Sequence, residues 1–239
     1  HAARIADASQ SNGFESDNNA EGSTAEPFTS ATFSNMTFLG PKVFDANFQN
    51  TTDYLGGGKM NPGNGSSTGR FQAGMHLRRN TRLNCYNSVV AGWPIGLILD
   101  SEKGNTQKAA TDGLLQLHRI VFAGTDITGS DFNKVYKDEL YNYQSKTTDP
   151  SKKSFSSTFF LLPANGNKVV DQWVARSWQG IQSIIAASTS VGGALRGSFA
   201  ELQSNNWFDK SAIFVGAFRD ASDDWTAGWA NFDPENTIY

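Results

Sequence analysis

The sequence predicts an all-β fold, a right-handed parallel β-helix formed by one domain over residues 1–239, and three observations support it. An eight-residue segment recurs without gaps at 33–40 (FSNMTFLG), 85–92 (CYNSVVAG) and 117–124 (LHRIVFAG). Each copy ends in glycine, which permits a sharp turn after a strand. Only 18% of residues are charged, whereas small polar residues and glycine are abundant, and this composition suits turns better than long helices.

The repeat predicts which residues occupy equivalent positions in the coils. Phe33, Cys85 and Leu117 share its first position, so we expect their side chains to point inward on neighbouring coils. Cys85 is therefore expected to be a buried apolar residue rather than a nucleophile. Gly40, Gly92 and Gly124 close the three copies and are expected at equivalent corners.

A second recurrence consists of a glycine followed by alternating residues. It comprises GFESDN at 13–18, GMHLRRN at 74–80, GLILDS at 96–101 and GLLQLH at 113–118. Alternation with a period of two predicts strands. No tight Asn-Gly turn joins these strands, which favours stacked parallel coils over an antiparallel sandwich.

The remaining segments are interpreted as excursions and a cap. The stretches at about 41–74 and 128–162 are expected to form long loops, the second with a short helix at best. Apolar residues at helical spacing predict a helix over 168–188, although its second half also fits a strand. The aromatic and acidic segment at about 207–239 is expected to cap the solenoid.

Charge and composition exclude several classes of partner. Lys plus Arg number 20 and Asp plus Glu number 23, so no general attraction to nucleic acid is expected. No segment has the roughly 20 apolar residues of a membrane span. The single Cys85 excludes an internal disulfide. The chain begins without a signal-like segment, and we expect it to be part of a longer precursor.

The quoted motifs, together with GFESDNNAEGS, NSVVAGWPIGLILD and the terminal DDWTAGWANFDPENTIY, resemble a known family over nearly the whole chain. This family comprises the uncharacterised secreted or surface-attached parallel β-helix proteins of Bacteroidota. The resemblance implies an extracellular or outer-membrane location, as a lipoprotein or a secretion cargo whose anchor lies upstream. The family provides no catalytic set that could be transferred.

One group of charged residues suggests chemistry. Glu15 and Asp17 lie on one predicted strand, and His76, Arg78 and Arg79 lie on the matching later strand. Polysaccharide lyases on β-helices combine acidic residues with a basic residue that removes a proton. An exposed ladder of ion pairs is the structural alternative. We call these five residues the charged face.

A calcium loop is only half present. Asp17, Asn19 and Glu21 provide alternating oxygen ligands before Gly22, but the twelfth position is Phe28 instead of a glutamate. A polar turn explains the same residues. No other cofactor is predicted, because the sequence has no dinucleotide fingerprint, phosphate loop or zinc-ligand spacing.

Tryptophan is the remaining candidate for binding. Trp93, Trp225 and Trp229 could form a platform on which sugar rings stack. Alternatively, Trp225 and Trp229 cover the end of the core, where an indole shields a large apolar area. We expect the second arrangement for these two residues.

No catalytic residue is assigned, and His118, which aligns with Tyr86 in the repeat, is expected to be a solvated surface histidine. The leading hypothesis is a non-catalytic surface or secreted module that presents loops to a glycan or a protein. The alternatives are a polysaccharide lyase or hydrolase, and an accessory subunit of an outer-membrane complex.

Overall fold

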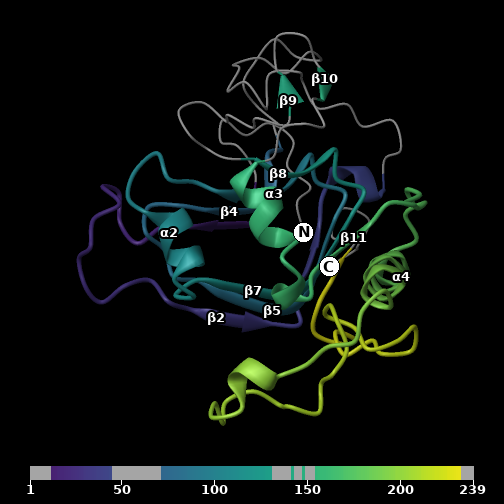
Figure 1. Ribbon diagram of the computed structural model, residues 1–239. Coiled ribbons are helices and arrows are strands. Elements are labelled where there is room, and N and C mark those ends of the chain that lie inside the picture. The colour runs from purple at the N-terminus through teal and green to yellow at the C-terminus, as the bar shows by residue number, and fades with distance from the viewer. Residues whose placement is uncertain (1–11, 45–70, 131–140, 143–146, 149–153, 233–239) are drawn as a thin grey trace.

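Two parallel sheets form the body of the protein in the computed structural model, which describes residues 12–44, 71–130, 141–142, 147–148 and 154–232 (Figure 1). The first sheet has the strand order β1 (Phe14–Ser16), β4 (Ala73–Leu77), β6 (Ile95–Leu99), β8 (Ile127–Ser130). The second has the order β2 (Thr32–Ser34), β5 (Asn84–Ala91), β7 (Gln116–Ala123), β11 (Lys168–Val170), and β3 (Thr37–Leu39) also pairs with β5. The chain passes alternately from one sheet to the other, so each strand pairs with its equivalent one coil away.

Helices are short and lie outside this strand path. They are η1 (Pro41–Val43), α2 (Thr106–Thr111), α3 (Phe155–Phe160), η2 (Pro163–Asn165), α4 (Ile181–Gly192) and η3 (Ala200–Leu202). A separate antiparallel pair joins β9 (Tyr141–Asn142) and β10 (Thr147–Thr148). Within the described part of the chain, none of the helices has the length and apolarity needed to cross a membrane.

The strand register confirms the eight-residue repeat. Phe33 pairs with Cys85, and Cys85 pairs with Leu117. The corners also stack, because the Gly40 N–H donates to the Ala91 carbonyl and the Gly92 N–H donates to the Ala123 carbonyl. A local pattern of apolar residues and a closing glycine therefore located three coils correctly.

The second recurrence is correct for three of its four copies. Phe14 pairs with Met75 and Met75 pairs with Leu97, so the segments that begin at 13, 74 and 96 are equivalent. The segment 113–118 is not. It follows α2 and enters β7 in the other sheet, because Leu117 belongs to the first repeat as well. A two-residue alternation is common to both sheets and cannot assign a strand to one of them.

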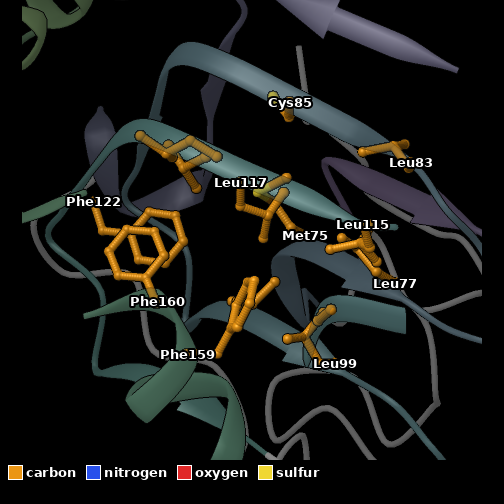
Figure 2. Packing of buried hydrophobic residues seen from close by; sticks show 14 of the residues in the cluster. Met75, Leu77, Leu83, Cys85, Leu99, Leu115, Leu117, Phe122, Phe159 and Phe160 are labelled. Carbon is orange, nitrogen blue, oxygen red and sulfur yellow. The ribbon is translucent and has the colours of Figure 1, made fainter. Parts of the chain in front are cut away.

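Side chains between the two sheets form the main core (Figure 2). Cys85, Leu117 and Met75 are fully buried there, which confirms the structural role predicted for Cys85. α3 contributes Phe159 and Phe160, and the Phe160 ring stacks on Phe122 at 3.9 Å between centroids. α3 contacts β6 and β8, so this helix closes the core on the side of the last coil.

A left-handed backbone position recurs at the same place in every coil of the second sheet. The registers of β2, β3, β5 and β7 align Asn35, Asn87 and Arg119, whose φ angles are 56°, 48° and 55°. Extending the register of β11 and β7 by two residues adds Gly166, with φ of 62°. The residue with positive φ bends each strand at this position, so the two halves of β5 and of β7 face different directions.

An outer layer covers the second halves of these strands. Val89 and Val121 point away from the main core and pack against Val191 of α4 and Val215 in the C-terminal segment. Asn87 connects the layers: its Nδ2 donates to the Ser198 carbonyl and its Oδ1 accepts from the Ser198 N–H. In Figure 1, α4 and the yellow-green C-terminal chain lie outside the sheet.

The predicted C-terminal cap is therefore corrected. The described part of 207–239 lies along the outer face of β3 and β5, where the Ala217 N–H donates to the Thr37 hydroxyl and the Gly216 N–H donates to the Asn87 carbonyl. Residues 233–239 lie outside the described residues. Hydrogen bonds to polar acceptors on the sheet hold this segment along the side of the coils. Sequence patterns do not reveal these acceptors.

Described helices and strands also lie within the other predicted segments. The stretch 168–188 contains β11 and most of α4, so the helix occupies the second half, which had also fitted a strand. The 128–162 stretch contains most of β8 and the short helix α3. The excursion at 41–74 includes η1 and the start of β4, and its residues 45–70 lie outside the described part. The right-handed sense of the coils stays a prediction.

We expect the Cys85 thiol to be unreactive in the folded protein. Burial raises its pKa to about 12, so the reactive thiolate is scarce, and the side chain is fully enclosed. A colorimetric disulfide reagent at mildly alkaline pH should label the native chain slowly and should label one thiol per chain after addition of guanidinium chloride. Labelling of native protein at the rate of a free thiol would contradict the predicted burial.

Two variants separate the hydrogen-bonding role of the Asn87 amide from the role of its left-handed backbone. Asn87→Gly keeps the left-handed backbone accessible but removes the amide, and leaving its buried partners unsatisfied should cost about 1–3 kcal/mol. Asn87→Ala loses the same hydrogen bonds but keeps a Cβ in the left-handed conformation, so it should be about 1–2 kcal/mol less stable than the glycine variant. Denaturant unfolding monitors both. Equal stability of the glycine and alanine variants would argue against the backbone role.

Candidate functional site

The predicted charged face forms where β1 meets β4. Arg78 Nε donates to Asp17 Oδ1 (2.7 Å), and Arg79 Nη1 donates to Asp17 Oδ2 (2.8 Å). Arg78 also forms an ion pair with Glu15 at 3.2 Å. The predicted pairing of opposite charges on neighbouring coils is confirmed for these four residues. Both carboxylates are neutralised by guanidinium groups, and pairs of this exposure contribute about 0–1 kcal/mol each.

His76 does not belong to this exposed face. It pairs with Glu15 in the backbone register, yet its side chain is buried and its Nε2 lies 3.2 Å from Asp100 Oδ2. The prediction of an exposed ladder is wrong for this residue. No sequence motif marks Asp100, which lies on the following coil.

The residues of the calcium candidate do not converge on one point. Asp17 is occupied by two arginines, and Asn19 Oδ1 accepts the backbone N–H groups of Glu21 and Ser23. Glu21 points into solvent with an ion pair to Lys103 at 3.7 Å. These contacts support the polar turn as the explanation of the motif. Among the described residues, no group of three or more His, Cys, Asp or Glu side chains is suited to hold a metal.

A cluster of polar and aromatic groups lies on the first halves of β5 and β7. The Tyr86 and His118 rings stack at 5.8 Å with 8° between their planes, and the Tyr86 hydroxyl donates to Gln116 Oε1 (2.7 Å). Arg119 Nη1 donates to Glu201 Oε1 at 2.8 Å. His118 is therefore half-buried between strands and η3, not a solvated surface histidine.

Burial and charge shift the titration of this cluster. Desolvation lowers the pKa of His118, and burial raises the pKa of Tyr86 to about 12. The hydrogen bond from Arg119 holds the pKa of Glu201 below its usual range. His118 Nδ1 lies 3.7 Å from Glu201 Oε1, and Glu201 is paired with Arg119, so the cluster is interpreted as a structural contact between β7 and η3.

The aromatic strip is the third candidate, and we define it as the buried Phe218 together with the exposed Trp225 and Trp229. Their ring centroids follow one another at 6.0 Å and 5.4 Å. Trp225 is 52% exposed and Trp229 is 68% exposed. The expectation that the two tryptophans cover the end of the core is wrong, because the segment lies on the side of the coils.

Both exposed indoles are held in place by backbone acceptors. Trp225 Nε1 donates to the Ala217 carbonyl (2.7 Å), and Trp229 Nε1 donates to the Trp225 carbonyl (2.9 Å). The rings therefore present apolar faces with little remaining freedom. Trp93, the third predicted platform residue, is 1% exposed and donates to the Phe38 carbonyl. It belongs to the core and is removed from the platform.

Two shallow hollows adjoin the strip. One lies between the end of α4 and the C-terminal segment; it is lined by Thr189, Gly192, Gly193, Leu195, Arg196, Ile213, Phe214, Val215, Phe218 and Arg219. The other lies beside the turn that contains both tryptophans; it is lined by Gly180, Ile181, Asp224, Thr226, Ala227, Ala230, Asn231 and Phe232. Sequence reasoning missed the arginines of the first hollow, which no motif marks.

These stacked, in-register strands define a parallel β-helix protein, with an exposed aromatic surface on its outer layer. A family model described as a pectate-lyase-like β-helix domain matches residues 2–179, and the chain belongs to this family. Comparison with curated proteins and with solved structures gave no match. The aromatic strip lies C-terminal to the matched region.

We expect the free energy of unfolding to fall as the pH is lowered, because His118 and Glu201 in this cluster have lowered pKa values. The pKa of folded His118 lies below its ordinary value of 6.5, so between these values the unfolded chain binds more protons. Glu201, whose pKa lies below its ordinary 4.5, loses its stabilising effect at lower pH. Melting temperatures of His118→Asn should vary less than wild type between pH 7 and 5. Glu201→Gln should flatten only the more acidic range; identical profiles for all three proteins would refute the assignment.

Proposed function

We propose that the chain is a non-catalytic glycan-binding module whose contact surface is the aromatic strip. The observation that supports it is a pair of neighbouring tryptophans, more than half exposed yet fixed by hydrogen bonds from both indole nitrogens. Exposed aromatic surface of this kind marks binding sites in soluble proteins. A rigid indole stacks on the apolar C–H face of a sugar ring, and its fixed position reduces the ordering cost of binding.

Binding without turnover fits the chemistry of the strip. Its three side chains are apolar, and the adjoining carboxylates are engaged by their own turns: Asp223 accepts from the Arg219 N–H, and Asp224 accepts from Thr226. An acid or base fixed in this way is poorly placed to transfer protons to a bound sugar. The description of the family, pectate-lyase-like, is compatible with a role on polysaccharide.

We propose that this module acts at the cell surface or outside the cell, where polysaccharides occur. The resemblance described above supports that location. The sequence predicts that long loops present the binding surface, whereas we assign that surface to the C-terminal layer on the sheet. Binding to a surface protein or to an outer-membrane complex is the alternative that the experiment below separates.

A polysaccharide lyase or hydrolase is the second candidate. The charged face favours it, because Arg78 and Arg79 lie beside Glu15 and Asp17 on adjacent strands, the combination that proton abstraction next to a carboxylate uses. Formation of unsaturated or reducing ends from a polysaccharide panel would establish turnover and overturn the non-catalytic assignment. Loss of that turnover in Arg78→Gln would assign it to the charged face.

Tryptophan variants test the binding surface directly. Trp225→Ala and Trp229→Ala should each weaken binding to a retained polysaccharide in affinity electrophoresis by roughly 30-fold, the effect of losing an aromatic hot spot. Because both rings are exposed, melting temperatures should change little. Trp207→Ala is the matched control, since Trp207 is 88% exposed and lies outside the strip. Equal retention of all variants, or no retention of wild type by any polymer, would overturn the proposal.

A further inference from the structure

Arg196 and Arg219 differ from the arginines that hold the fold together. Arg78, Arg79 and Arg119 form ion pairs with Asp17 or Glu201. Within the described residues, neither Arg196 nor Arg219 has a side-chain hydrogen bond or ion pair. Arg219 lies over the Phe214 ring, 5.7 Å from its centroid, and both arginines are exposed. Two guanidinium groups therefore keep their donors available.

The two arginines line the same hollow from different segments. Arg196 follows α4, and Arg219 follows the C-terminal stretch that lies on β3 and β5. A hydrogen bond from the Gly197 N–H to the Ile213 carbonyl (3.0 Å) joins these segments. The backbones that bear both guanidinium groups are thus held together before any ligand binds, which lowers the cost of binding.

The hollow adjoins the aromatic strip at Phe218, a residue that is only 4% exposed. Phe218 lines the hollow and is also the first ring of the strip, 6.0 Å from Trp225. A chain molecule stacked on Trp229 and Trp225 therefore extends toward the two arginines. Planar guanidinium groups bind carboxylates and sulfates through paired hydrogen bonds.

From this arrangement we infer that the glycan is anionic, and that Arg196 and Arg219 bind its carboxylate or sulfate groups beside the aromatic strip. The inference rests on the proposed function and names the substrate class of that site. Asp209, Asp220 and Asp223 are carboxylates near Arg219, and Asp223 accepts from the Arg219 N–H. The other two accept hydrogen bonds from their own turns, Asp209 from Ser211 and Asp220 from Ser222.

Three polymers with one backbone test the inference: dextran, carboxymethyl dextran and dextran sulfate. Wild type should be retained about tenfold or more strongly by a charged dextran than by dextran at low salt, the gain of one charge-assisted contact. Comparing the two charged polymers distinguishes carboxylate from sulfate. The double variant Arg196→Gln with Arg219→Gln should lose this preference without a change in melting temperature.

Lys108→Gln on α2 is the control, because it removes an exposed positive charge from an element that does not line the hollow. It should keep the preference of wild type. Equal retention on dextran and both charged polymers, absence of retention on both charged polymers, or an undiminished preference in the double arginine variant would overturn the inference.

The tryptophan variants separate failure of the inference from failure of the proposed function. If they lose retention on every polymer while the arginine variant behaves as wild type, the strip binds glycan and the anionic class is wrong. If the arginine variant alone loses retention, the anion site stands and the aromatic strip is not the binding surface.

Discussion

The left-handed backbone position repeated at Asn35, Asn87, Arg119 and Gly166 is the constraint on which the outer layer depends. A residue with positive φ turns each strand of the second sheet, so that its second half faces α4 instead of solvent. Asparagine tolerates this conformation better than most residues, and its amide also bonds to neighbouring backbone. Asn35 and Asn87 use that amide to hold segments more than 100 positions later in the chain.

The bend thus determines where the aromatic strip lies. Asn35 Nδ2 donates to the Phe214 carbonyl (2.7 Å), and Thr37 and Asn87 accept from the next residues of the C-terminal segment. The segment is fixed along the side of the coils. Its following turn, which contains Trp225 and Trp229, projects into solvent instead of covering the core. The fold consequently separates a closed apolar interior from a rigid aromatic exterior.

Membership of the pectate-lyase-like β-helix family accounts for the coils, and most of the outer layer lies C-terminal to the matched region. The matched region ends at residue 179, before α4 and before the aromatic strip. A solenoid that carries the proposed binding surface on an outer layer is consistent with function residing in sites and not in folds. The charged face, by contrast, lies on the coils themselves, where its arginines neutralise neighbouring carboxylates.

The sequence by itself determined the coils. Apolar residues at fixed positions and closing glycines follow from local backbone geometry. They therefore predict the equivalent positions of Phe33, Cys85 and Leu117 from the sequence alone. The pairing of opposite charges on matching strands was also predictable, because strands in register place equivalent positions of neighbouring coils side by side.

Only the tertiary structure decided the burial of Trp93 and the exposure of Trp225 and Trp229. It also decided the partners of Arg119 and His76, which are Glu201 and Asp100. These features depend on where a chain returns to the sheet after leaving the repeat. That path is chosen by hydrogen bonds and packing between residues far apart in the sequence, which no local period encodes.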